Sequence, residues 1–545
     1  MKKNNAENLI KNIERILPVA FLLAMFLLDT WFLVCRGAAY IDADMAADVV
    51  YADFLNSQGK IISDAWWHST QLKLGEVLNL IQIGLLISPN NWVIARAIGV
   101  MLINIFAVIA YYFCSKTFDN KKGQSLLFAA FMISPFGYYF FEFSIFGGFY
   151  TATLIYSMLI LMLIVLDIKN PVNDIKVKWK VYLPVIAIGV LLGISGLRYA
   201  IFPVIPLIGT AVFFVFDIAH NRKEELKDFT IPEMRICVTT GLLTLAFAMG
   251  YVLNVAVLAK KYTYEQFGEI TWGPLSFDNL VTGVFEFLSL FGYQYDDVMM
   301  MWTQQKATIS VFSLQGIATC FGILIAGFLV FSIVSLMRRY KELSFYNRFI
   351  VVLFLISVLV SAVIFKMTRG FDAEAQYWIP LIGLSFLVMQ AEINTEKLSL
   401  KYTKDVIVLV LVFSIAICSI ASVRQYEKTP THANPQLVNI AKLLQESGYK
   451  QGYATFWYAP AITFLTNGEI EMWSIYEFTN LEHSMPWLQK MSHIDSPSEA
   501  RTCAVIGPID GINHDEYFPY MDVRPGTPSE VYYDEDGFII VEYNK

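Results

Sequence analysis

The chain contains repeated apolar stretches of roughly the length that a membrane-spanning helix needs. A helix crosses the hydrocarbon core of a bilayer with about 20 residues. Such stretches recur throughout the first 422 residues, at Ile16–Cys35, Trp92–Cys114, Gln124–Phe140, Gly148–Leu166, Tyr182–Gly196, Ala200–Phe216, Ile236–Leu258, Ile309–Leu336, Phe349–Phe365, Tyr377–Met389 and Val406–Ser422. The sequence therefore predicts a polytopic α-helical membrane protein with about 11 transmembrane helices.

Composition supports the same class of protein. Of the 545 residues, 56% are hydrophobic and only 16% are charged, whereas soluble domains carry about 25% charged residues. The net charge of −7 and the lack of a basic stripe exclude a basic nucleic-acid binder. The six cysteines show no C-x-x-C spacing, so the sequence predicts neither a disulfide framework nor a cysteine-based metal site.

The orientation of the chain follows from its basic residues. The first apolar stretch is longer than the core of a signal peptide and has no convincing A-x-A site, so we expect an uncleaved first span. Lysine and arginine are concentrated in alternate loops, which places the N-terminus in the cytoplasm. With an odd number of spans, the last section lies outside. We therefore expect a multi-pass protein of the cell (plasma) membrane.

Two domains are predicted. Residues 1–422 form a transmembrane domain, with a first outside loop over 37–91 and a second large outside loop over 259–308. Residues 423–545 form a small extracytoplasmic α/β domain, because NPQLVNIAKLLQESGY is typical of a helix and GYATFWY, TCAVIGP and GFIIVEY are typical of strands. This second domain carries no recognisable catalytic constellation.

The first outside loop opens with an acidic segment, YIDADMAADVVYADFLNSQGK. A carboxylate close to the bilayer surface can act as a general base or a cation ligand, although acids in an exposed loop can also serve solubility alone. Apolar residues follow Asp44 at helical spacing, and Gly59 is a stop signal. We therefore predict a helix with Asp42 and Asp44 at its N-terminus, where the helix dipole favours the ionised carboxylate.

This segment resembles the GT-C superfamily of membrane glycosyltransferases, which includes protein O-mannosyltransferases and lipid A aminoarabinose transferases. In that family the first outside loop opens with a catalytic aspartate, and a glycine closes the following helix about fifteen residues later. That spacing counted back from Gly59 gives Asp44. The family's second span often begins with a small residue and arginine, as Ala95-Arg96 does here. The usual Asp-Glu pair is replaced, since Met45 follows Asp44 and the second acid is Asp42.

The resemblance implies an inverting transfer of a sugar from a polyprenyl-phosphate carrier to an acceptor hydroxyl on the outer face of the membrane. Asp44 would be the general base, and Asp42 a second acid that orients the acceptor or binds a divalent cation. Which of the two takes the proton stays open. The implied partners are the polyprenyl-phosphate sugar donor, the lipid bilayer, and a glycan, lipid or protein acceptor.

An anionic lipid phosphate as leaving group requires cations at the same level of the membrane. Arg96, Arg198 and Arg369 are each expected at the outer end of a span, and a guanidinium binds phosphate oxygens bidentately. Alternatively, each arginine pairs with a nearby acid or reaches the lipid headgroups. Further candidate substrate-binding residues in the first outside loop are Lys60, Trp67 and His68. A tryptophan there can equally be an interfacial anchor, and a lone histidine can equally be a surface or hydrogen-bonding residue.

Two other functions fit a chain of this kind. A transporter or flippase for a lipid-linked substrate would use ionisable residues within its spans, and Asp29 lies within the first span. A non-catalytic membrane protein that binds glycan would keep the architecture without the reaction.

Overall fold

A computed structural model describes most of the chain, over residues 2–69, 72–169, 175–264, 271–292, 310–369, 375–395, 403–428, 430, 433–476, 484–494, 501–510, 528–533 and 537–544. These residues form two compact units, each described by itself. The helical unit comprises residues 1–29, 103–254 and 268–428, and the mixed unit comprises residues 30–102, 255–267 and 429–545.

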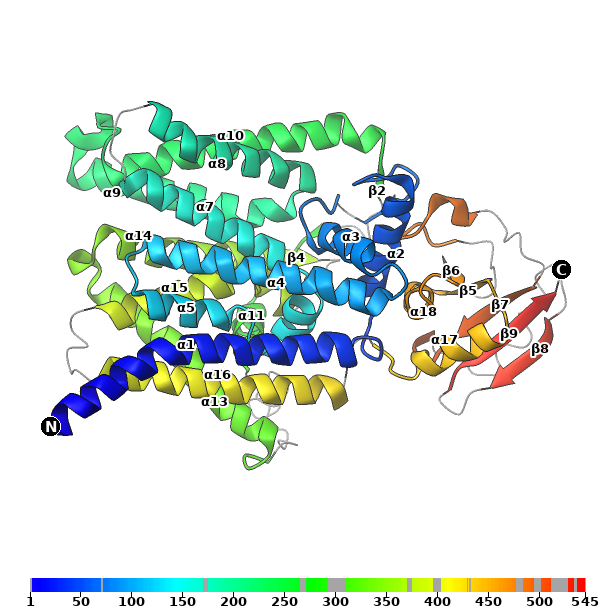
Figure 1. Cartoon of the computed structure of the whole chain (residues 1–545). Helices are drawn as coiled ribbons and strands as arrows, with labels where there is room; N and C mark the ends of the chain where they lie inside the picture. Colours follow the sequence, from blue (N-terminus) through cyan, green and yellow to red (C-terminus); the bar gives the residue numbers. More distant parts are fainter. Residues whose placement is uncertain are drawn as a thin grey trace. The chain divides into compact units, whose positions relative to one another are not determined.

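Helices make up most of the helical unit (Figure 1). They are α1 (Lys2–Cys35), α4 (Trp92–Thr117), α5 (Lys122–Phe131), α6 (Tyr138–Phe140), α7 (Thr151–Lys169), α8 (Ile175–Ser195), α9 (Ile205–Asn221), α10 (Pro232–Ala256), α11 (Phe277–Ser289), α13 (Leu314–Arg338), α14 (Phe345–Met367), α15 (Leu381–Asn394) and α16 (Thr403–Lys428). One end of α1, of α4 and of α10 belongs to the mixed unit. Strand β3 (Thr271–Trp272) pairs with β4 (Thr368–Arg369) in antiparallel fashion.

Nine helices among the described residues are long and apolar enough to cross a membrane. The predicted polytopic helical membrane fold is therefore confirmed. Two of the predicted spans are shorter in the structure. Tyr377–Met389 corresponds to the 14-residue α15, and Gln124–Phe140 is divided between α5 and α6. The break after Phe131 has a local cause, because Pro135 lacks an N–H to donate to the Phe131 carbonyl and its ring would clash with it.

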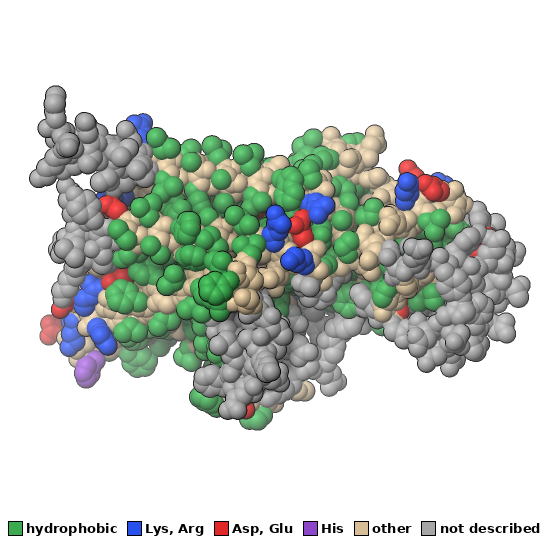
Figure 2. All heavy atoms as spheres, turned by 90° about the horizontal axis from the view of Figure 1, so that it is seen from below, with side chains coloured by type: hydrophobic (Ala, Val, Ile, Leu, Met, Phe, Trp, Pro, Cys, Tyr) green, Lys and Arg blue, Asp and Glu red, His purple; other side chains and the backbone are tan. Residues whose placement is uncertain are grey.

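The outer surface of the helices is apolar. Leu245, Met249 and Val252 on α10 are between 62% and 68% exposed, and Figure 2 shows that hydrophobic side chains cover much of one face of the molecule. Exposed apolar residues that recur along whole helices are expected where lipid, not water, is the solvent.

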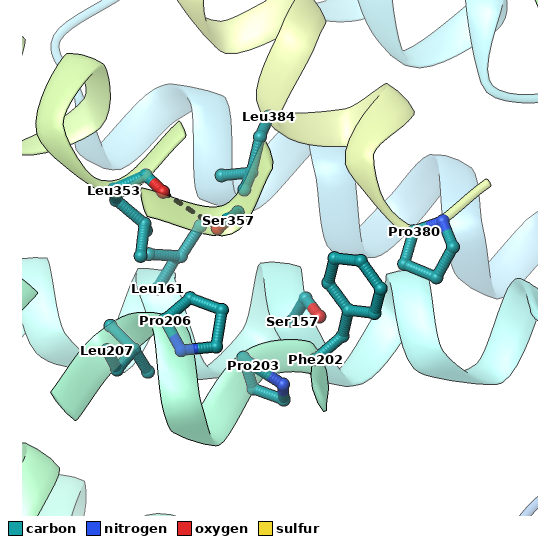
Figure 3. A pocket seen from close by; sticks show the side chains of 10 residues that line it. All are labelled: Ser157, Leu161, Phe202, Pro203, Pro206, Leu207, Leu353, Ser357, Pro380 and Leu384. Carbon is teal, nitrogen blue, oxygen red and sulfur yellow. Dashed lines mark hydrogen bonds between the residues drawn. The ribbon is translucent and has the colours of Figure 1, made fainter. Parts of the chain in front are cut away.

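A small void lies in the packed interior of the helical unit, between α7, α9, α14 and α15 (Figure 3). Its volume is about 10 Å³ and its lining is mainly apolar. The two serine hydroxyls in its wall donate to carbonyls of their own helices, Ser157 to Thr153 at 2.8 Å and Ser357 to Leu353 at 2.7 Å. We interpret this void as a packing feature of the core.

The mixed unit contains the first outside loop and a five-stranded sheet. Its helices are α2 (Ala43–Gln58), α3 (Val77–Ile87), α17 (Leu437–Glu446) and α18 (Ala459–Leu465), and its strands are β1 (Trp67–His68), β2 (Thr263–Tyr264), β5 (Gln451–Thr455), β6 (Glu471–Ile475), β7 (Arg501–Ile506), β8 (Pro528–Tyr533) and β9 (Ile539–Asn544). In the part of the chain that the structure describes, the sheet order is β6-β5-β7-β9-β8. Strand β5 is parallel to β6 and β7, whereas β9 is antiparallel to β7 and β8.

The small C-terminal α/β fold is thus confirmed, and β5, β7, β9 and α17 lie where the sequence predicted them. The sequence did not predict strands β6 and β8, which the structure shows. The mixed unit groups this sheet with the first outside loop, and the boundary at 422/423 stays a prediction. Part of the second outside loop, over 265–270 and 293–308, lies outside the described residues.

Candidate functional site

Asp42 and Asp44 occupy different environments at the start of α2. Asp42 is the N-cap residue: its Oδ1 accepts a hydrogen bond from the Met45 backbone N–H at 2.6 Å, and the residue is only 5% exposed. An N-cap of this kind stabilises a helix by about 1 kcal/mol. Asp44 lies in the first turn and is exposed. Asp42 therefore caps the helix, whereas Asp44 lies at the surface, and a catalytic role for either acid stays a prediction.

The apolar face predicted for α2 is present. Met45, Val49, Ala52 and Leu55 are each no more than 1% exposed. The helix ends at Gly59, whose φ of 63° and ψ of 33° lie in the left-handed region. Both local signals that were read from the sequence, the apolar spacing and the terminal glycine, therefore define this helix.

Replacement of Gly59 by alanine should destabilise the protein through the backbone alone. A Cβ at this position would meet no atom within 4 Å, so the cost comes from the left-handed conformation, about 1–2 kcal/mol. Gly59→Asn should cost less, because asparagine tolerates that region. Thermal unfolding midpoints of the two variants in detergent would test this, and equal losses would contradict it.

A buried ion pair lies beside the first turns of α2. Lys73 Nζ contacts Asp48 Oδ1 at 2.5 Å, with the lysine 17% and the aspartate 3% exposed. Burial lowers the pKa of Lys73, but the negative charges of Asp48 and Asp44 outweigh that effect, so the pKa is raised and the ammonium stays charged. Lys73 is thus a cation within electrostatic range of Asp44. The sequence analysis did not predict Lys73 as a site residue, because a lysine in the same loop was the only indication that the sequence offered.

A void of about 10 Å³ adjoins this ion pair. Asp48 Oδ2 and Trp66 Nε1 are both buried and have no hydrogen-bond partner among the described residues. The void is lined by Ala47, Asp48, Tyr51, Trp66, His68, Ser69, Lys73 and Leu488. Its volume matches the space that one water molecule needs.

His68 lies inside an aromatic cluster. It is 3% exposed, its Nε2 is 2.9 Å from the Ser63 carbonyl oxygen, and its ring lies 5.5 Å from Tyr51 and 5.8 Å from Tyr262, each in edge geometry. Trp67 beside it is half-buried. The parallel pairing of β1 with β2 holds both residues. Lys60 is exposed and contacts Asp64 at 3.4 Å. Substrate binding by these residues stays a prediction.

Arg96 lies beneath the start of α2. It is 2% exposed, and its Nη2 lies 2.9 Å from the Met45 sulfur. Because Met45 follows Asp44 directly, this arginine is held close to the candidate base by packing within one unit. A phosphate-binding role for Arg96 stays a prediction.

Arg198 and Arg369 belong to the helical unit. Arg198 is exposed, with its guanidinium 5.3 Å from the Tyr150 ring centre. The backbone of Arg369 pairs with Thr271 in the β3–β4 ladder, and its side chain lies outside the described residues. Lys366, three residues before Arg369 in the sequence, forms an ion pair with Glu286 at 2.5 Å. Since each unit is described by itself, convergence of Arg198 and Arg369 on Asp44 stays a prediction.

No group of three or more histidine, cysteine, aspartate or glutamate side chains comes together among the described residues in a way that could hold a metal ion. A divalent cation near Asp42 and Asp44 would therefore need ligands from the substrate or from water as well, as Mg²⁺ often takes. The cation stays a prediction.

The free energy of unfolding is expected to depend on pH through two buried histidines, His68 and His493. Burial lowers the pKa of His68 and of His493 below the ordinary value of 6.5. The unfolded chain therefore takes up protons at a pH where the folded chain does not, so the free energy of unfolding should fall as pH drops below about 6.5. Unfolding midpoints measured from neutral pH to about pH 5 would test this. His68→Gln should make the unfolding midpoint depend less steeply on pH. An unchanged dependence would contradict a contribution from His68.

Comparison with known proteins identifies the fold. No protein-family model matches the sequence, and neither does any curated protein. The structure of ArnT from Cupriavidus metallidurans bound to undecaprenyl phosphate superposes with a TM-score of 0.53 at 10% identity, over 96% of this chain and 97% of that one. ArnT is a GT-C aminoarabinose transferase. The chain has the GT-C fold.

The apo oligosaccharyltransferase from Archaeoglobus fulgidus gives a TM-score of 0.48 at 10% identity, covering 84% of this chain and 64% of that one. This second similarity is weaker than the first. The match to ArnT confirms at the level of the fold the resemblance that Asp42–Gly59 and Ala95-Arg96 indicated.

Proposed function

We propose that this GT-C chain is a membrane glycosyltransferase that moves a sugar from a polyprenyl-phosphate carrier to an acceptor hydroxyl at the outer face of the membrane. The fold supports this, because the ArnT structure that shares it contains undecaprenyl phosphate. The observation that carries the proposal is the exposure of Asp44. Its neighbours Asp42 and Asp48 are buried, the first as a helix cap and the second in an ion pair.

The reaction follows from these groups. Asp44, which lies in the first turn of α2 and within electrostatic range of Lys73, takes the proton of the acceptor hydroxyl. The hydroxyl oxygen then forms a bond to the anomeric carbon from the face opposite the carrier, which inverts that carbon. The bond from the anomeric carbon to the phosphate oxygen breaks, and the carrier phosphate leaves with the electron pair.

The other parts of the site complete the proposal. Arg96, Arg198 and Arg369 stabilise the charge that develops on the carrier phosphate, and Lys60 is a further cation for donor binding. Trp67 offers a ring face on which the sugar can stack, and His68 supports it. Asp42 orients the acceptor or, together with Asp44, holds a divalent cation.

The test uses purified full-length protein with polyprenyl-phosphate carriers that bear a radiolabelled hexose or pentose. We expect release or transfer of the label from at least one carrier. Movement of an intact carrier across proteoliposomes without cleavage would replace the proposal with the transporter hypothesis. Binding of glycan without turnover would favour the non-catalytic one.

A further inference from the structure

We propose that Leu488, far away in the C-terminal part of the sequence, is a positioning residue that fixes the first turns of α2 and thereby Asp44. Leu488 lies in the loop that follows β6, and hydrogen bonds hold this loop both to the sheet and to the first outside loop. The kinetic consequence rests on the proposed function, but the positioning does not.

The first step is the contact with α2. Leu488 is 7% exposed and packs together with Met485 and Phe456 against Ala43 and Ala47. These two alanines flank Asp44 on the helix. Because alanine has only a methyl group to offer, the packing at this turn comes from the C-terminal side chains. Leu488 also lines the void beside Asp48 and Lys73.

The second step is the conformation of the loop. Leu488 has a φ of 49°, in the left-handed region that a leucine rarely adopts. Such a conformation persists only where the surroundings determine it, and it is enriched at functional sites. It points to a side chain whose direction is fixed by the fold.

The third step is what holds the loop to the sheet. Gln489 Nε2 donates to the Ser474 carbonyl at 3.0 Å, while its Oε1 accepts from the Ser474 N–H at 3.0 Å. The Met485 N–H also donates to the Ser474 carbonyl, at 2.9 Å. His493 Nδ1 lies 2.9 Å from Gln489 Oε1. The loop is therefore fastened to β6, whose Trp473 and Ile475 belong to the sheet core.

The fourth step is what holds the loop to the first outside loop. The Trp67 N–H donates to the Gln489 carbonyl at 2.8 Å, and the Met491 N–H donates to the Ala65 carbonyl at 3.0 Å. Lys490 Nζ lies 5.4 Å from the ring centre of Phe54, which is on α2. Nearby, α18 packs against α2; Figure 1 shows α18 beside that helix. The loop thus connects the sheet to both α2 and the segment that carries Trp67.

These contacts determine the expected effect on catalysis. A general base must lie within hydrogen-bonding reach of the proton it takes, and a displacement of about 1 Å can cost about 100-fold in rate. The Leu488 side chain packs with the α2 alanines, whereas Trp67 is held through the Gln489 backbone carbonyl, which a change of the Leu488 side chain leaves in place. Loss of the Leu488 side chain should therefore lower kcat while leaving the KM for the donor nearly unchanged.

The experiment compares Leu488→Ala, Leu488→Gly and Leu488→Met in the full chain. We expect kcat to fall about 10- to 100-fold for the alanine and glycine variants, with Leu488→Met close to wild type. Glycine accommodates a positive φ, so Leu488→Gly tests the side chain without backbone strain. Val541→Ala is the matched control, since Val541 is also a buried apolar residue but belongs to the sheet core and not to the cluster on α2; it should lower stability without changing kcat of the folded protein.

Amide hydrogen exchange over residues 43–50 gives a readout that needs no activity. We expect faster exchange there in Leu488→Ala and Leu488→Gly, and no change in Val541→Ala. Wild-type kcat together with unchanged exchange in the glycine variant would overturn the positioning role. If the variants show faster exchange but even the wild-type protein transfers no sugar, the result would support the positioning role and count against the proposed function.

Discussion

Asp44→Asn is expected to abolish measurable sugar transfer while the protein folds normally. Asparagine has nearly the same shape but cannot take a proton, and the loss of general-base catalysis costs about 10²–10⁴ in rate. Because Asp44 is exposed, the exchange should leave packing unchanged. The measurement is the initial rate of label transfer, with the unfolding midpoint as the check on folding. Full activity would remove Asp44 from the mechanism.

Two further variants sharpen this test. Asp42→Asn keeps an N-cap, because asparagine caps helices about as well as aspartate, so it asks whether the second acid is needed as a charge. If Asp42→Asn is inactive and Asp44→Asn is active, the roles of the two acids are reversed. Asp53→Asn, at an exposed position on the same helix, is the matched control and should transfer at the wild-type rate.

Asp48→Asn is expected to be the most destabilising single charge removal in the first outside loop. It removes the carboxylate that lies 2.5 Å from the Lys73 ammonium, and breaking a buried ion pair costs about 3–5 kcal/mol. The matched control is Asp64→Asn, which breaks the exposed pair between Lys60 and Asp64. Exposed pairs contribute little, so its unfolding midpoint should stay at the wild-type value. Equal midpoints for the two variants would show that the buried pair contributes nothing.

Lys73→Met tests the same pair from the other side. It should lower the unfolding midpoint, and it should also shift the acidic limb of the pH–rate profile to higher pH. The reason is that ionised Asp44 loses a neighbouring positive charge. A lower midpoint with an unshifted profile would make Lys73 a structural residue alone.

The sequence by itself determined the membrane class and the helix that carries Asp44. Both depend on local signals. Runs of apolar residues must cross a bilayer as helices because the backbone has no other way to satisfy its hydrogen bonds there. The bounds of α2 follow from an N-cap at Asp42 and a left-handed glycine at Gly59. Such signals act over a few residues, and a pattern in the chain records them.

The tertiary structure alone decided which side chains surround that helix. Lys73 meets Asp48 across 25 residues of sequence, and Leu488 reaches Ala43 and Ala47 from the far end of the chain. The same packing separates Asp42, a buried cap, from the exposed Asp44. These relations depend on how distant elements pack, and no periodicity, spacing or composition encodes them. Asp44 was therefore predictable as an acid at a helix start, whereas the side chains from distant parts of the chain that surround this helix were not.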